Sequence, residues 1–344
     1  MKPRALRALI MHVSRRCDQT CAHCSIWRGA RSARGELQLK ERLDIIREAH
    51  SLGARSVLFT GGEPLLCAHI ETLARTARDL GLTVQLATNG LGVGRASEWL
   101  AEVVDEVYVS IEGPEEVHDR VRGPGMFKRL ADSLAELAAR HRRPRLVGRC
   151  VIAAGNAGLI EATVGAARRL GLDALSFLPV DVESDAFGGE PESRRPLRPS
   201  VREVTAVLEA IERLSLSGEL ESFVLEDERK LGMMARDFLL EPAVRTAPSC
   251  NAPEWSSVVD ADGGIRPCFF QPAVAAAPNA GIGAVRMSSP YLETLGGLGE
   301  GNRICATCVC PKHVRAGFES VSARIASVLR RVRPGKTHPA GSPA

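Results

Sequence analysis

Three cysteines, Cys17, Cys21 and Cys24, lie close together in the run CDQTCAHC, directly after a β-like segment. The short gaps between them let one loop carry three thiolates to a single centre. An iron–sulfur cube is normally held by four cysteine thiolates, so a cube on this loop would keep one iron open to a small molecule. The spacing therefore favours a catalytic cluster. The alternative is a tetrahedral zinc site with His23 or His12 as the fourth ligand.

Three further motifs follow in order along the chain. GGEP occupies Gly61–Pro64 after an apolar run, ATNG occupies Ala87–Gly90, and VSIEGPEEVHDRVRG runs from Val109 to Gly123. Together with the cysteine run, these motifs resemble the radical S-adenosylmethionine (radical SAM) superfamily, whose signature is Cys-x3-Cys-x2-Cys. The resemblance covers roughly the first 180 residues, and four motifs in family order at family-like spacing favour it over the zinc site.

The resemblance implies a [4Fe–4S] cluster on Cys17, Cys21 and Cys24, with S-adenosylmethionine chelated at the open iron. An electron from the reduced cluster would break the sulfur–C5′ bond, and the resulting 5′-deoxyadenosyl radical would take a hydrogen atom from a small-molecule substrate. The chemistry belongs to the cofactor, while the protein positions the reacting atoms. An electron donor of the flavodoxin or ferredoxin type is expected.

The resemblance also assigns contacts to the cofactor. The backbone and carboxylate of the GGEP motif would bind its amino group, two polar side chains would bind its ribose or carboxylate, and a guanidinium fork would bind its carboxylate. Turn chemistry or surface charge is the plain alternative for the last three side chains. The expected cofactor-binding residues are Gly61, Gly62, Glu63, Asn89, Ser110 and Arg122.

A second cysteine group occupies the C-terminal part of the sequence: Cys250, Cys268, Cys305, Cys308 and Cys310. DADGGIRPC reads as a hairpin turn that delivers Cys268. The layout resembles the twitch domain, a shortened form of the SPASM extension, which implies an auxiliary [4Fe–4S] cluster on the first four of these cysteines. Four thiolates saturate a cube, so this cluster would carry electrons. A zinc ribbon is the alternative, and the role of Cys310 stays open.

Short β-rich runs alternate with helix-length amphipathic segments from residue 6 to about residue 180. The expected strands are Ala8–Val13, Ser56–Thr60, Thr83–Ala87, Glu106–Ile111, Leu146–Ala153 and Ala174–Pro179. Strands that alternate with helices predict a parallel sheet. Six units are too few for an eight-stranded barrel, and the resemblance implies an α/β fold with a partial (β/α)6 TIM-like barrel and a small C-terminal iron–sulfur domain (β-hairpin plus helix). All four motifs then fall at the C-terminal ends of strands, where parallel barrels carry their chemistry.

The chain is long enough for one large domain and a smaller one. The expected division is a radical SAM barrel over 6–216, a connector over 217–249, an auxiliary cluster domain over 250–315, a C-terminal helix over 316–334 and a disordered tail over 335–344.

The composition argues against two classes of partner. A net charge of +4 on an ordinary globular composition is too small to indicate nucleic-acid binding. No apolar run approaches the length of about 18 residues that spans a membrane, and no signal-peptide cleavage site precedes the first cysteine. We therefore expect a cytoplasmic protein without a nucleic-acid or membrane partner.

The sequence supports an oxidoreductase that uses the auxiliary cluster for a net two-electron oxidation of a sugar-like or other small metabolite. Maturation of a ribosomal peptide is a second possibility, because many SPASM proteins act on peptides, although few residues precede the first strand. A zinc-stapled, non-catalytic binding protein is the alternative from another class. The sequence identifies neither the substrate nor a general base, nor the oligomeric state.

Overall fold

The computed structural model describes residues 5–29, 35–184, 186–189, 191–239, 250–297 and 305. Cys308, Cys310, the expected helix over 316–334 and the expected tail over 335–344 lie outside these residues, as does part of the expected connector. The described strands form one sheet in the order β6-β5-β4-β3-β2-β1-β7-β8-β9.

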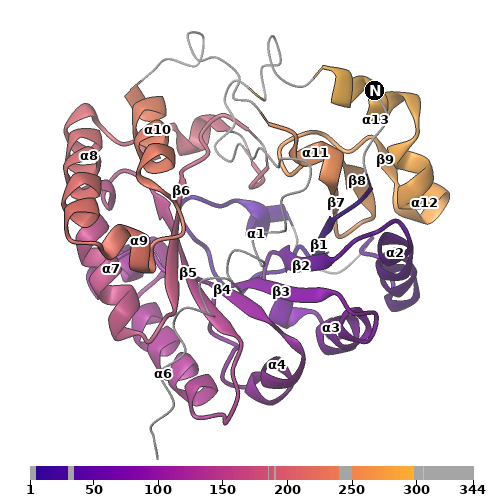
Figure 1. Ribbon diagram of the computed structural model, residues 1–344, viewed down its shortest axis with the longest axis horizontal. Helices are drawn as coiled ribbons and strands as arrows, with labels where there is room; N and C mark the ends of the chain where they lie inside the picture. The colour runs from indigo at the N-terminus through magenta and orange to yellow at the C-terminus, as the bar shows by residue number, and fades with distance from the viewer. Residues whose placement is uncertain are drawn as a thin grey trace, which may run out of the picture.

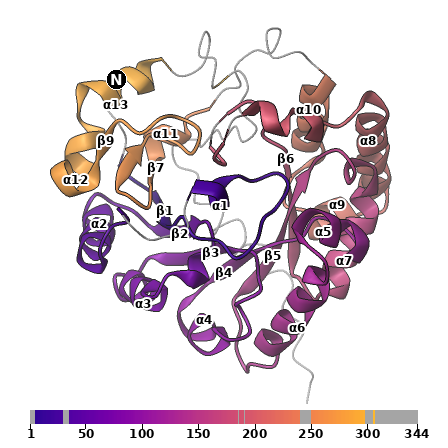
Figure 2. The ribbon, with the colours of Figure 1, turned by 180° about the vertical axis from the view of Figure 1, so that it is seen from behind.

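Six parallel strands form the partial barrel: β1 (Ala8–Ser14), β2 (Ser56–Gly61), β3 (Thr83–Thr88), β4 (Glu106–Ser110), β5 (Arg145–Ile152) and β6 (Ala174–Pro179). Each pairs in parallel with the next. The helices that cover them are α2 (Leu39–Ser51), α3 (Ile70–Asp79), α4 (Ser97–Val103), α5 (Glu115–Arg122), α6 (Met126–Ala138), α7 (Ile160–Arg169) and α8 (Val201–Leu216). Figures 1 and 2 show these helices around the outer side of the strands. The predicted partial (β/α)6 barrel is confirmed, and each strand lies within a residue or two of its predicted position.

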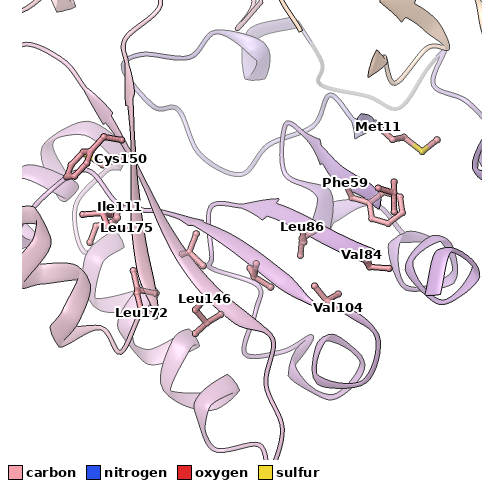
Figure 3. Packing of buried hydrophobic residues seen from close by; sticks show 14 of the residues in the cluster. Met11, Phe59, Val84, Leu86, Val104, Ile111, Leu146, Cys150, Leu172 and Leu175 are labelled. Atoms are coloured by element: carbon pink, nitrogen blue, oxygen red, sulfur yellow. The ribbon is translucent and has the colours of Figure 1, made fainter. Parts of the chain in front are cut away.

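The main core lies between the sheet and these helices. Along β1, Leu9, Met11 and Val13 are buried in it, while Ile10 and His12 alternate onto the opposite side of the strand. This period of two is what a strand with two different faces requires. Figure 3 shows core residues from β1 to β6 in one continuous cluster, among them Met11, which packs from the first strand.

The opposite side of the sheet, here called the inner face, carries a second, small apolar cluster. Tyr108, Val147 and Ala174 form it, with Leu58 and Ala87 packed against them. These residues come from β2 to β6, so the cluster closes the interior of the barrel. This cluster is called the apolar floor of the barrel. Polar side chains that lie nearer the C-terminal strand ends on the same face are above it.

The C-terminal part continues the barrel sheet. Strand β7 (Ser256–Val259) pairs in parallel with β1, and β8 (Gly264–Arg266) and β9 (Ala275–Ala276) follow in antiparallel pairing. Helices α11 (Ala252–Trp255), α12 (Ala277–Arg286) and α13 (Ser289–Gly296) accompany them. The Glu48 carboxylate of α2 accepts hydrogen bonds from the backbone of Ile282 (2.9 Å) and Gly283 (3.0 Å) in α12. This part is thus fixed to the first strand and helix of the barrel, as Figure 2 also shows.

Shorter elements complete the described chain: α1 (Ile26–Gly29), η1 (Pro64–Leu66), η2 (Ala157–Leu159), η3 (Pro191–Leu197), α9 (Glu219–Phe223) and α10 (Glu228–Leu239). Helix α1 follows the first cysteine run and lies inside the ring of helices in both views (Figures 1 and 2). Among the helices of the described ranges, none has the length and apolar character needed to cross a bilayer.

Candidate functional site

The first cysteine loop is hydrogen-bonded to the GGEP motif that follows β2. The Gly62 N–H donates to the Ser14 carbonyl (2.7 Å), and the Glu63 N–H donates to the Arg16 carbonyl (2.7 Å). A side chain on Gly61 would stand 2.3 Å from the Ser14 carbonyl oxygen, and one on Gly62 would stand 2.3 Å from that of Arg16. Gly61 also has a φ of +133°, which favours glycine. The two glycines are needed because the start of the cysteine loop packs directly against them.

The Glu63 carboxylate joins the GGEP motif to the ATNG motif after β3. It is buried and accepts hydrogen bonds from the Thr88 hydroxyl (2.8 Å), the Asn89 N–H (2.8 Å) and the Leu65 N–H (3.0 Å). Burial raises its pKa to about 7, although these hydrogen bonds act in the opposite direction. Glu63 therefore organises the strand ends beside the cysteine loop.

Asn89 and Ser110, both expected at the cofactor, have partners within the protein. The Asn89 amide donates to the Asp18 carboxylate (2.6 Å), and its oxygen accepts from the Leu91 N–H (2.9 Å). Asp18 lies inside the cysteine run, so Asn89 holds the loop from the side of β3. The Ser110 hydroxyl donates to the Thr88 carbonyl (3.3 Å), which leaves its lone pairs available.

Arg122 is buried and paired with Glu112. Its Nε and Nη2 donate to Glu112 Oε1 (3.0 and 2.6 Å), and its Nη1 donates to Gln19 Oε1 (2.8 Å) in the cysteine run. Burial alone would raise the pKa of Glu112, but the charge of Arg122 and then that of His23 hold it below its usual value. His23 Nε2 lies 3.8 Å from Glu112 Oε1. Arg122 thus orients the cysteine loop with its charge balanced by a carboxylate.

Glu112 was not among the residues expected from the sequence. Its side chain is 1% exposed and meets both the Arg122 fork and the Val151 N–H (3.3 Å). The signal in the sequence was Glu112 inside VSIEG and Arg122 ten residues later. Glu112 precedes helix α5, and Arg122 is its last residue. Only the fold shows that these two charges meet each other and Gln19.

The three thiols of the loop suit a soft metal centre. Burial raises the pKa of Cys17 to about 12 and also raises those of Cys21 and Cys24. The charge of Cys21 contributes to the pKa shifts of Cys17 and Cys24, so Cys21 lies near both. Among the described residues, no group of three or more His, Cys, Asp or Glu side chains is arranged to bind a single metal ion. Thiolates are the ligands that iron–sulfur clusters require, and each binds its own iron of a cube, so these residues fit such a group.

Two cysteines of the second group, Cys250 and Cys305, lie near enough to Cys268 for their charges to affect its pKa. Burial raises the pKa of Cys268 to about 11, and the charges of Cys250 and Cys305 add to that shift. Gln271 Nε2 lies 3.8 Å from the Cys305 sulfur. Cys268 follows β8, as the hairpin prediction required. The fourth expected ligand, Cys308, is outside the described residues.

A loop after β6 contacts both cysteine regions. The Phe187 carbonyl accepts a hydrogen bond from the Ser25 N–H (2.8 Å) and lies 3.8 Å from the Cys24 sulfur. Its ring lies 5.3 Å from that of Phe269 and 6.5 Å from that of Phe270, the two residues that follow Cys268. Aromatic rings at these distances are in contact, so an apolar wall connects the two regions.

The fully buried Arg194 holds this loop. Its guanidinium donates to the backbone carbonyls of Asp181 (2.9 Å), Gly188 (2.5 Å) and Ser184. Three carbonyls around one cation give this loop a defined course. The loop is therefore an ordered part of the site.

Comparison with known proteins gives three kinds of match. Residues 11–155 match the sequence profile of the Radical SAM superfamily. An AdoMet-dependent heme synthase of Oleidesulfovibrio alaskensis is 35% identical over 128 residues, which cover 36% of this chain and 33% of the relative. GTP 3′,8-cyclase 2 of Mycobacterium tuberculosis is 38% identical over 143 residues, 40% of this chain and 39% of the relative. The chain thus spans between a third and two fifths of the length of these curated relatives.

Solved structures resemble this chain over more of its length. SuiB of Streptococcus suis bound to its precursor peptide SuiA superimposes with a TM-score of 0.63 at 16% identity, covering 89% of this chain and 71% of SuiB. Native anSMEcpe with bound AdoMet gives a TM-score of 0.62 at 18% identity, covering 83% of this chain and 82% of that protein. At these identities the likeness is one of fold.

Proposed function

We propose that this protein, whose residues 11–155 match the Radical SAM superfamily profile, binds a [4Fe–4S] cluster through Cys17, Cys21 and Cys24 and uses S-adenosylmethionine to start a radical reaction. When bound, the cluster and S-adenosylmethionine supply a 5′-deoxyadenosyl radical that abstracts a hydrogen atom from the substrate. The observation that carries this proposal is the way three strand-end motifs hold the cysteine loop. Gly62, Asn89 and Arg122 each bond a different part of it.

The protein's own residues position the reactants. The backbone around Gly61 and Gly62, with Glu63, is the proposed site for the cofactor's amino group, since Glu63 already orders this strand end. Asn89 and Ser110 are the proposed contacts to its ribose or carboxylate. Arg122 is the proposed contact to its carboxylate, and it also fixes Gln19 and the loop while Glu112 balances its charge. Binding the cluster requires the loop cysteines to lose protons that burial makes them retain.

We further propose an auxiliary [4Fe–4S] cluster on Cys250, Cys268, Cys305 and Cys308. What supports it is the proximity of Cys250 and Cys305 to Cys268 in the structure. An electron acceptor there suits a net two-electron oxidation, with a sugar-like or other small metabolite as the substrate and a flavodoxin- or ferredoxin-type donor for the first cluster. The relatives named above include a heme synthase and a cyclase, so the oxidative outcome is the part of this proposal that most needs testing.

The proposed function is tested by anaerobic reconstitution followed by incubation with S-adenosylmethionine and dithionite. We expect the wild type to form 5′-deoxyadenosine and methionine, and Cys21→Ala to form neither. Cys67→Ala is the matched control, because Cys67 is a buried cysteine outside both groups that accepts a hydrogen bond from Arg42 (2.9 Å). Unchanged 5′-deoxyadenosine from Cys21→Ala, or none from the wild type, would contradict the proposal.

A further inference from the structure

Three arginines, one at the cysteine loop and two on β5, can be compared, and two of them are paired with a carboxylate. Arg122 is paired with Glu112 at 2.6 Å, and Arg145 is paired with Glu106 at 2.8 Å. Arg149 differs from both. Among the described residues, no carboxylate lies within ion-pair distance of its guanidinium, whose contact is with the ring of Tyr108.

Arg149 points into the barrel. On β5, Leu146, Cys150 and Ile152 are buried in the core beneath the helices, while Val147 belongs to the inner-face cluster. Arg149 lies two residues after Val147 and therefore shares its side of the strand. This arginine stands on the inner face, above the apolar floor.

The neighbouring strands place two hydroxyl-bearing residues beside Arg149. Ser110 of β4 and Ser176 of β6 are its register partners. Their protons are already committed, to the Thr88 carbonyl (3.3 Å) and to the Glu226 carboxylate (2.9 Å). Of these three neighbouring side chains, only that of Arg149 therefore has a hydrogen-bond donor without an acceptor.

Two features hold the guanidinium ready for a ligand. Its carbon lies 4.3 Å from the centre of the Tyr108 ring, a stacking contact that fixes the plane of the fork. Its Nε is buried and has no hydrogen-bond partner. A buried donor without an acceptor is unfavourable. A carboxylate or phosphate that accepts two hydrogen bonds from the guanidinium would pair this donor and balance its charge.

We propose that Arg149 binds an acidic group of the substrate, a carboxylate or a phosphate, inside the barrel. The substrate class is then an anionic small molecule. This inference rests on the proposed function, which places a substrate at the mouth of the barrel. Under that function the cofactor's carboxylate already has a proposed contact in Ser110, whereas Arg149 has no role at the cofactor, which favours the substrate as the source of the acid. Because Ser110 is a register partner of Arg149, the cofactor's carboxylate is tested directly as the other source.

The test is equilibrium binding of two probes, malonate and inorganic phosphate, to reconstituted protein by anaerobic calorimetry without reductant. Arg149→Gln removes the charge, and Arg149→Lys keeps the charge without the fork. Arg145→Gln is the matched control, since Arg145 is on the same strand and face but is paired with Glu106. Because no reductant is present, the result does not depend on whether the protein cleaves S-adenosylmethionine, so failure of the proposed function would be seen separately.

We expect the wild type to bind at least one probe saturably, and Arg149→Gln to bind it at least about tenfold more weakly. Arg149→Lys should fall between them, and Arg145→Gln should stay within about threefold of the wild type. Melting by circular dichroism verifies folding, and Arg149→Lys carries the comparison where Arg149→Gln fails to fold. Equal binding by both Arg149 variants and the wild type, or no saturable binding by the wild type, would overturn the proposal.

A second arm separates the two sources of the acid. S-adenosylhomocysteine carries the amino-acid carboxylate, and 5′-methylthioadenosine lacks it. We expect Arg149→Gln to bind both as the wild type does. A loss of about tenfold for S-adenosylhomocysteine alone would show that Arg149 serves the cofactor and would overturn its assignment to the substrate.

Discussion

The two cysteine regions of this chain differ in what holds them. The loop that carries Cys17, Cys21 and Cys24 is bonded by strand-end groups that belong to the barrel itself. Cys268 sits at a hairpin end, and Cys250 and Cys305 reach it from segments far apart in the chain. The first site is therefore largely arranged by the fold, whereas we expect the second to depend more on its metal for order, because metal binding contributes directly to folding in such sites.

The largest expected effect separates the two regions directly. Cys268→Ala should lose the auxiliary cluster, so that iron per chain falls by about half, while slow formation of 5′-deoxyadenosine continues and substrate oxidation stops. Iron analysis and product chromatography measure both quantities. Iron content equal to that of the wild type would show that Cys268 is not a ligand, and the contrast between the two cysteine regions would then fail.

The support of the first loop is tested by Glu112→Gln. This change leaves the buried Arg122 without its carboxylate, and breaking such a pair costs about 3–5 kcal/mol of unfolding free energy. Denaturant unfolding measures it. Glu219→Gln is the control, because its pair with Arg168 is exposed at 2.6 Å and should cost at most about 1 kcal/mol. Equal costs for the two variants would mean that the Glu112–Arg122 pair does not brace the loop.

The link between Asn89 and Asp18 is tested by a double-mutant cycle. Asn89→Ala and Asp18→Ala each remove one partner of the 2.6 Å hydrogen bond. We expect a coupling free energy of about 1 kcal/mol from unfolding of the single and double variants. Strictly additive costs would show that the ATNG motif does not hold the loop through this contact.

Glu63 gives a test of another kind, a pH dependence. Its pKa in the folded protein is raised from 4.5 to about 7, so between these values the folded state binds more protons than the unfolded state. Stability contributed by this group is present below about pH 4.5 and is lost as the pH rises through about 7. Glu63→Gln should flatten that loss in unfolding measurements across this range. The same slope in the variant would assign the titration to another group.

Much of the barrel was predictable from the sequence, because each strand is a short β-rich run whose two faces differ. Leu9, Met11 and Val13 mark the core face of β1 without reference to any other strand. The pairing of β7 with β1 was not predictable in this way, since it joins residues that are far apart in the chain. A pattern of alternation does not say which strand comes to lie next to which.

The site was predictable where a motif is local. The cysteine spacing and GGEP identify their loops, but the sequence does not show that the space left by Gly61 and Gly62 is filled by the Ser14–Arg16 backbone. Arg122 was expected at the cofactor's carboxylate, and Glu112 was missed as its partner. Arg149 was overlooked because the sequence does not show which side chains surround it. Among the described residues no carboxylate pairs with it, and this is seen only when the neighbouring strands are in place.

The central claim is that Cys17, Cys21 and Cys24 hold a cube with one iron open to S-adenosylmethionine. Electron paramagnetic resonance of the reduced Cys268→Ala variant tests it most directly, because the auxiliary signal is then absent. We predict a [4Fe–4S]⁺ signal whose g-values shift when S-adenosylmethionine is added. A signal that S-adenosylmethionine leaves unchanged, or zinc in place of iron, would contradict the account.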